Sequence, residues 1–206
     1  FGRKKPFLMG AFLMGALGIG GMPLLNGYVS KTLLHESIVE YILHLTAHGH
    51  SALLFQAIEW IFLFSGGLTA AYMLKLFVCL FVERNPEKQE QYDEKSTYMS
   101  PLSKMVLGLT AAILPVMGAL PGMTMDRMAD GVMNFMGSGP LHHKVHYFTW
   151  VNLKGGLISI GIGVAVYFLV IRKFFMKDGS YVDLWPEKLD LEAMKAAAEH
   201  LCGEHD

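Results

Sequence analysis

The sequence predicts an all-α integral membrane protein with about four transmembrane segments, the first of them a discontinuous helix, and a short amphipathic C-terminal helix. Three observations support this fold class. Hydrophobic residues make up 52% of the 206 residues and charged residues only 17%, whereas about 25% is usual in soluble domains. The mean hydropathy is +0.36. The apolar residues also fall into four long blocks, at 6–41, 52–82, 102–120 and 151–171.

The lengths of these blocks fit membrane-spanning helices. About 20 apolar residues cross a bilayer as a helix, so blocks 102–120 and 151–171 fit one crossing each. Only helices and closed barrels satisfy every backbone group in lipid, and no alternating ten-residue strands occur in this chain. Block 52–82 is long enough to tilt or to extend beyond the bilayer. A soluble bundle with buried helices is the alternative, and runs this long disfavour it.

The first block is too long for one crossing. Its 36 residues would form a straight helix of about 54 Å, against a hydrocarbon core of about 30 Å. Proline removes a backbone donor and disfavours helix at the preceding residue, and glycine permits turns. We therefore expect helices over 7–22 and 29–45, with Pro23 ending the first; a simple proline kink is the alternative. The expected break contains Gly20, Gly21, Pro23, Asn26 and Gly27.

Lysine and arginine are distributed unevenly among the segments that connect the blocks. Alternate sides of the predicted membrane carry 12 and 3 of them, and the histidine-rich loop 43–51 lies on the poorer side. Under the positive-inside rule, both chain ends are cytoplasmic, and we expect a multi-pass protein of the plasma (cell inner) membrane. We reject a signal peptide at the basic N-terminus, because no small-residue cleavage site follows it. The chain begins at Phe1, so we expect a piece of a longer subunit.

Lys31 is the principal candidate for chemistry. A lysine inside a span costs about 2.5–3.5 kcal/mol on insertion scales, so it usually faces the protein interior or a wet cavity. We expect it in the first turn of the second helix, where the partial positive charge of the helix start disfavours the ammonium and desolvation does the same. His35 shares its helical face, and Glu36 lies on a neighbouring row. The alternatives are a lysine that reaches the membrane interface and a polar helix end.

Glu59 and Lys75 are further relay candidates within the second block. Along a helix they are about 24 Å apart, too far for direct contact. The alternative is that each anchors one membrane interface. The Ser65-Gly66-Gly67 stretch between them predicts close helix approach or a local opening.

We predict no metal site, no cofactor and no redox catalytic site in this chain. The histidines have ligand-like spacing but lack companion cysteines or carboxylates at a recognised interval, so we interpret them as polar loop residues. Phosphate-loop, C-x-x-C, G-x-S-x-G, flavin, haem and iron–sulfur signatures are absent from the sequence. A formal net charge of −1 offers no footprint for nucleic acid. The histidines in question are His48, His50, His142, His143 and His146.

Two segments outside the blocks have amphipathic patterns. Segment 123–136 is predicted to lie on the membrane surface as a helix. The C-terminal segment has Pro186 at a suitable helix start and a weak apolar side. We therefore divide the chain into a transmembrane domain, 1–175, and a cytoplasmic amphipathic tail, 176–206; a frayed terminus is the alternative for the tail.

Three stretches of the sequence resemble a known family: PLLNGYVSKTLLHE, SGGLTAAYMLKLFVCLFVERN and SPLSKMVLGLTAAILPVMGALPG. They are similar to the C-terminal third of the antiporter-like membrane subunits. These subunits occur in respiratory complex I (NADH:quinone oxidoreductase), in formate-hydrogenlyase-type membrane-bound hydrogenases and in multisubunit sodium/proton antiporters. The tail DGSYVDLWPEKLDLE favours the hydrogenase-type members.

This resemblance implies a proton-translocating subunit of a redox-driven complex. It implies that Lys31 belongs to the family's broken twelfth helix and acts in the outward half of the proton path. Many members have an acidic residue directly after this lysine, whereas this chain has Thr32, so Glu36 or a neighbouring helix would supply the carboxylate. Flavin, iron–sulfur or nickel–iron centres are then expected only in partner subunits. A sodium/proton antiporter subunit and a structural membrane subunit are the alternatives.

Overall fold

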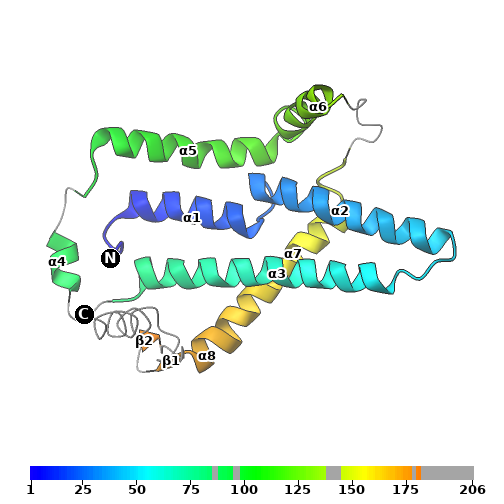
Figure 1. The fold of residues 1–206 in the computed structure, drawn as a ribbon. Coiled ribbons are helices and arrows are strands. Elements are labelled where there is room, and N and C mark those ends of the chain that lie inside the picture. Colours follow the sequence, from blue (N-terminus) through cyan, green and yellow to red (C-terminus); the bar gives the residue numbers. More distant parts are fainter. Residues whose placement is uncertain (85–87, 95–97, 138–144, 178–179, 182–206) are drawn as a thin grey trace, which may run out of the picture. The chain divides into compact units, whose positions relative to one another are not determined.

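A computed structural model describes residues 1–84, 88–94, 98–137, 145–177 and 180–181. The chain divides into two compact units, Phe1–Tyr167 and the residues from Phe168 onward. The first unit is a helical bundle (Figure 1). The second unit begins within a helix and contains two antiparallel strands of two residues each, in which Met176 pairs with Tyr181. The predicted C-terminal amphipathic helix lies outside the described residues.

The elements follow one another as a chain of helices, and the predicted all-α membrane fold is confirmed. Two of the helices have side-chain caps, because Ser100 and Thr149 each accept a hydrogen bond from the backbone N–H three residues later. The elements are α1 (Pro6–Gly20), α2 (Asn26–Ala47), α3 (Leu53–Phe77), η1 (Val78–Val82), α4 (Gln89–Glu94), α5 (Pro101–Ala119), α6 (Met125–Phe135), α7 (Trp150–Val166), η2 (Tyr167–Ile171), α8 (Arg172–Phe174), β1 (Met176–Lys177) and β2 (Ser180–Tyr181).

Three helical stretches are long and apolar enough to cross a membrane: Leu53–Val82, Pro101–Ala119 and Trp150–Phe174. Helix α1 is apolar but shorter, and its continuation α2 carries the polar residues of the first block. Large apolar side chains are exposed along all three stretches, as expected where lipid or further membrane helices cover them.

The predicted helix break is confirmed, but its limits differ from the prediction. Helix α1 ends at Gly20, and Gly21 takes the left-handed conformation (φ +81°) of a Schellman cap. Pro23 therefore lies inside the break instead of ending the first helix. Helix α2 begins at Asn26 instead of 29, which places Lys31 in its second turn; the expected position in the first turn is wrong.

Asn26 and Gly27 belong to the helix for a packing reason. A Cβ atom at Gly27 would lie 1.9 Å from the carbonyl oxygen of Gly18. The Asn-Gly pair, which suggested a turn, therefore allows the start of α2 to approach the end of α1 closely.

Small residues determine how closely α3 and α7 pack. A Cβ atom at Gly67 would lie 2.9 Å from the carbonyl oxygen of Ser159, and one at Gly163 would lie 2.7 Å from that of Gly67. The close approach predicted from the Ser-Gly-Gly stretch is therefore present. Helix α1 lies between α5 and α3 and contacts both (Figure 1).

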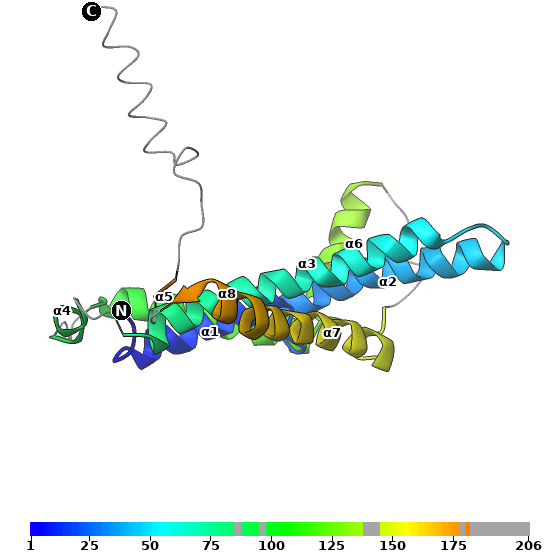
Figure 2. The same ribbon diagram turned by 90° about the horizontal axis from the view of Figure 1, so that it is seen from below.

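The N-terminus lies at the same end of the first unit as the α3–α5 connection. The backbone N–H of Gly2 donates to the carbonyl of Leu80 at 2.7 Å, and Lys4 Nζ lies 3.1 Å from a carboxylate oxygen of Asp93. The opposite end of α3 is joined to α2 by a short loop (Figure 2). The N-terminus and the α3–α5 connection, which are expected on the same side of the membrane, are thus neighbours.

Candidate functional site

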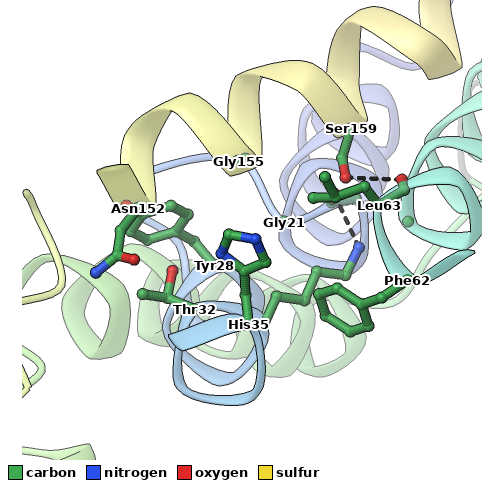
Figure 3. Close-up of a pocket in the computed structure, with 13 residues that line it drawn as sticks. Gly21, Tyr28, Thr32, His35, Phe62, Leu63, Asn152, Gly155 and Ser159 are labelled. Carbon is green, nitrogen blue, oxygen red and sulfur yellow. Dashed lines mark hydrogen bonds between the residues drawn. The ribbon is translucent and has the colours of Figure 1, made fainter. Parts of the chain in front are cut away.

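A small cavity, with polar groups set among apolar ones, lies beside the helix break, between α2, α3 and α7 (Figure 3). It offers about 20 Å³ to water-sized occupants, enough for an ordered water. Lys31, Thr32 and His35 line it from α2, and Asn152 and Ser159 line it from α7. The sequence therefore brings titratable and hydroxyl groups to the point where the backbone leaves regular helix.

Lys31 is half-buried and reaches back to the end of α1. Its Nζ donates to the carbonyl oxygen of Gly20 at 3.1 Å, one of the carbonyls that have no partner within their own helix. Helical side chains point toward the N-terminus, which is why a residue in the second turn of α2 reaches α1. The carboxyl end of a helix carries partial negative charge, so this end is a favourable partner for an ammonium. The head group of Lys31 therefore lies beside the negative end of α1, whereas the sequence places the lysine only near the positive start of α2.

Gly21 makes room for this lysine, and Gly66 makes room for Ser159 on the other side of the cavity. A Cβ atom at Gly21 would lie 2.8 Å from Lys31 Cδ and 3.3 Å from Nζ. Across the cavity, a Cβ atom at Gly66 of α3 would lie 3.7 Å from Nζ and 3.0 Å from Ser159 Oγ. The Ser159 hydroxyl donates to the carbonyl of Leu63 at 2.9 Å (Figure 3), which fixes the far wall.

His35 and Glu59 form a pair on the next turn. His35 Nε2 lies 3.1 Å from Glu59 Oε1, and their side chains are 9% and 27% exposed. The imidazole stacks on Phe62 of α3, with ring centroids 6.3 Å apart. Its other edge faces α7, where a Cβ atom at Gly155 would lie 3.2 Å from Nδ1. The histidine therefore bridges the cavity and a partly exposed carboxylate.

Glu36, one of the two expected sources of a carboxylate for Lys31, is engaged elsewhere. Its Oε2 accepts a hydrogen bond from Asn152 Nδ2 at 3.2 Å, and the same amide donates to the carbonyl of His146 at 3.1 Å. Asn152 is buried at the start of α7. Glu36 thus lies on a side branch of the site.

A second polar chain leaves the start of α2. The Tyr28 hydroxyl donates to the carbonyl of Tyr147 at 2.7 Å, and the Tyr147 hydroxyl donates to the carboxylate of Asp126 in α6. Burial raises the pKa of Tyr147, and the Asp126 carboxylate raises it further. This chain connects the helix break to the α6–α7 region.

The remaining predicted site residues lie apart from the cavity. Lys75 is half-buried in the last turn of α3 and does not line it. His48 and His50 are exposed beyond the end of α2. His142 and His143 fall outside the described residues.

Sequence reasoning missed the contribution of α7. Asn152 and Ser159 are polar residues in an apolar block, seven positions apart, with Gly155 and Gly163 at helical spacing on the same side. That stripe of polar and small residues was a readable signal for a face turned toward the protein interior. The pairing of Tyr28 with Tyr147, 119 positions away, left no comparable signal.

The described residues of this site bring together groups that can bind and release protons. Lys31, His35 and Glu59 follow one another from the break toward a partly exposed position, and a water-sized cavity lies between the lysine and the histidine. Water-bridged polar groups exchange protons without direct contact.

Comparison with known proteins gives one partial likeness. A 92-residue stretch, 45% of the chain, is 32% identical to NADH-ubiquinone oxidoreductase chain 5 of the sea anemone Metridium senile, and it covers 14% of that protein. No protein-family model matches the chain, and no solved structure shows significant similarity to it. The likeness supports, at a coarse level, a relationship to a membrane subunit of NADH-ubiquinone oxidoreductase.

Proposed function

We propose that the chain is part of a proton-translocating membrane subunit of a redox-driven ion pump, complex I-like or membrane-bound-hydrogenase-like. The observation that carries the proposal is the placement of Lys31 on the carbonyl end of a broken helix, with a water-sized cavity and the His35–Glu59 pair directly beyond it. The partial likeness to NADH-ubiquinone oxidoreductase chain 5 supports the same class.

In the proposed path, Lys31 is the station at the break. A proton that arrives from upstream parts of the subunit is held on Nζ by the carbonyl of Gly20. The surrounding apolar helices disfavour a permanent charge, so the ammonium can release its proton to water in the cavity. Charge on this group is therefore tolerated only while the carbonyl partner is in place.

His35 then transfers the proton across its ring. In the tautomer that carries its proton on Nε2, uptake at Nδ1 from the cavity is balanced by loss of the Nε2 proton to Glu59 Oε1. The product is a neutral histidine protonated on Nδ1 and a protonated Glu59. Glu59 releases its proton toward water, and the imidazole returns to the starting tautomer before the next transfer.

The proposal includes orientation and partners. Both chain ends lie on the cytoplasmic side of the plasma membrane, so the path from the break toward Glu59 leads outward. Other membrane subunits supply the upstream half of the path. Flavin, iron–sulfur or nickel–iron centres belong to those partners, and this chain contributes no redox step.

Proton flux in liposomes that contain the complete complex tests the proposal. Lys31→Ala should abolish redox-driven acidification. Lys31→Arg should abolish it too, because arginine keeps its positive charge but does not give up its proton. Lys104→Ala, at an exposed lysine near the start of α5, is the matched control and should pump normally.

The alternatives predict different results. A subunit with only a structural role would tolerate Lys31→Arg, since the cation and its contact with Gly20 remain. A sodium/proton antiporter subunit would show uptake of radioactive sodium that depends on Lys31. Either result would overturn the proposal of a proton relay.

A further inference from the structure

Helix α6 exposes an apolar face that the rest of the described chain does not cover. Met128, Val132, Phe135 and Met136 lie at helical spacing on this face and are 62%, 57%, 93% and 72% exposed. The opposite face is polar and carries Asp126, Arg127, Asp130 and Asn134. Exposed hydrophobic residues that are scattered singly need no explanation, but three on one face of an 11-residue helix, with a fourth at its C-cap, indicate that lipid or protein covers this face.

The position of α6 in the chain places it at a membrane boundary. Five residues separate it from the end of α5, which is long and apolar enough to be a membrane span. The next span starts at Trp150, which is 74% exposed, and exposed tryptophan is typical of the membrane–water interface. Helix α6 therefore connects two points at which the chain meets the bilayer surface.

The direction of α6 fits this position. It runs crosswise to the long axis of α2 and α3, whereas α5 runs along that axis (Figures 1 and 2). If the long helices cross the membrane, α6 lies along its surface.

The first turn of α6 is fixed to the protein, so its direction is determined. Met125 packs on the cluster of Tyr28, Val29 and Tyr147. The Asp126 carboxylate accepts a hydrogen bond from the Tyr147 hydroxyl. The rest of the helix extends from this anchor with its apolar face uncovered.

We propose that α6 is an interfacial helix whose apolar face inserts at the boundary between lipid headgroups and acyl chains. Helices of this kind bury an apolar face by about 5–10 Å. The polar face has one arginine against two aspartates, so the attraction is apolar and does not require anionic lipid. This proposal is independent of proton transfer.

Collision accessibility of spin labels tests the insertion. The protein, with the subunits that co-purify with it, is reconstituted into phosphatidylcholine nanodiscs after Cys79, Cys202 and any other cysteine that the reagent labels are replaced by serine. Single cysteines are introduced at Met128 and Phe135 on the apolar face, and at their neighbours Arg127 and Asn134 as matched controls. Each is labelled with a nitroxide and exposed to oxygen, which partitions into lipid, or to a water-soluble nickel complex.

We expect the labels at Met128 and Phe135 to collide with oxygen severalfold more often than with the nickel complex, and the labels at Arg127 and Asn134 to show the reverse. Nickel access at all four positions would place α6 in water and overturn the proposal. Protection of the apolar-face labels from both reagents would mean that protein covers this face, and would overturn it as well. The proton flux of these variants does not enter the test, because the collision rates alone distinguish the three outcomes.

Discussion

Gly21 offers a sharp test of what the helix break does for Lys31. The residue has φ +81°, a conformation that costs an L-residue with a side chain about 1–2 kcal/mol. The substitution Gly21→Ala also puts a methyl group 2.8 Å from Lys31 Cδ and 3.3 Å from Nζ. Because the lysine chain is flexible, this overlap is relieved by moving the lysine away from the Gly20 carbonyl.

The expected result has two parts. The backbone strain should lower the free energy of unfolding by about 1–2 kcal/mol, roughly a tenfold change in the unfolding equilibrium. Proton flux should fall further than the loss of folded protein explains. The reason is that the molecules that remain folded have lost the contact between Lys31 Nζ and the Gly20 carbonyl. Thermal denaturation in detergent and flux per electron transferred in proteoliposomes measure the two effects separately.

Gly10→Ala, within helix α1, is the matched control. A Cβ atom at Gly10 meets nothing within 4 Å, and replacing a helical glycine by alanine stabilises by about 0.5–1 kcal/mol. This variant should pump normally and denature no earlier than the wild type. The reasoning fails if Gly21→Ala pumps at the wild-type rate, or if Gly10→Ala loses as much flux as Gly21→Ala does.

Two further predictions concern carboxylates. Glu59→Gln keeps the contact with the buried histidine but removes the proton acceptor, so proton flux should fall roughly tenfold or more. The control Glu40→Gln, at an exposed position of α2, should leave the flux unchanged. Equal flux in both variants would exclude Glu59 from the path. A hydrogen bond from Gln89, and to a lesser extent one from Lys4, lowers the pKa of Asp93. The ion pair between Asp93 and Lys4 should therefore persist as the pH falls, until the pH reaches that lowered pKa and the carboxylate is protonated. Carbon NMR of labelled aspartate measures the midpoint, and a value at or above about 3.9 would contradict the assignment.

The helix break was predictable, but its limits were not. Length alone rules out one straight crossing, and Gly20, Gly21 and Pro23 mark the place. The Asn26-Gly27 pair has the composition of a turn, yet it starts α2, because Gly27 serves contact with the Gly18 carbonyl. That contact forms only when α1 and α2 pack together, so the local sequence around Asn26 and Gly27 does not predict it.

The site was predictable along one helix and not across helices. The four-residue spacing of Lys31 and His35 correctly predicts a shared face, whereas the partner of His35 depends on the packing of α3. The sequence indicates Glu59 either as a relay group or as an interfacial anchor, and the structure places it 3.1 Å from His35. Asn152 likewise reaches Glu36 only because α7 packs against α2.

The reversed electrostatics at Lys31 bear on how a broken helix can serve proton transfer. The break creates a helix start and a helix end within a few residues, and therefore a partial positive and a partial negative charge close together. Lys31 belongs to α2, yet its head group lies on the carbonyl end of α1. A small change in the angle between α1 and α2 would move the ammonium from a favourable to an unfavourable environment. A side chain at Gly21 would meet Lys31, and one at Gly27 would meet the Gly18 carbonyl, so substitutions at these positions should change that angle and impair proton transfer at Lys31.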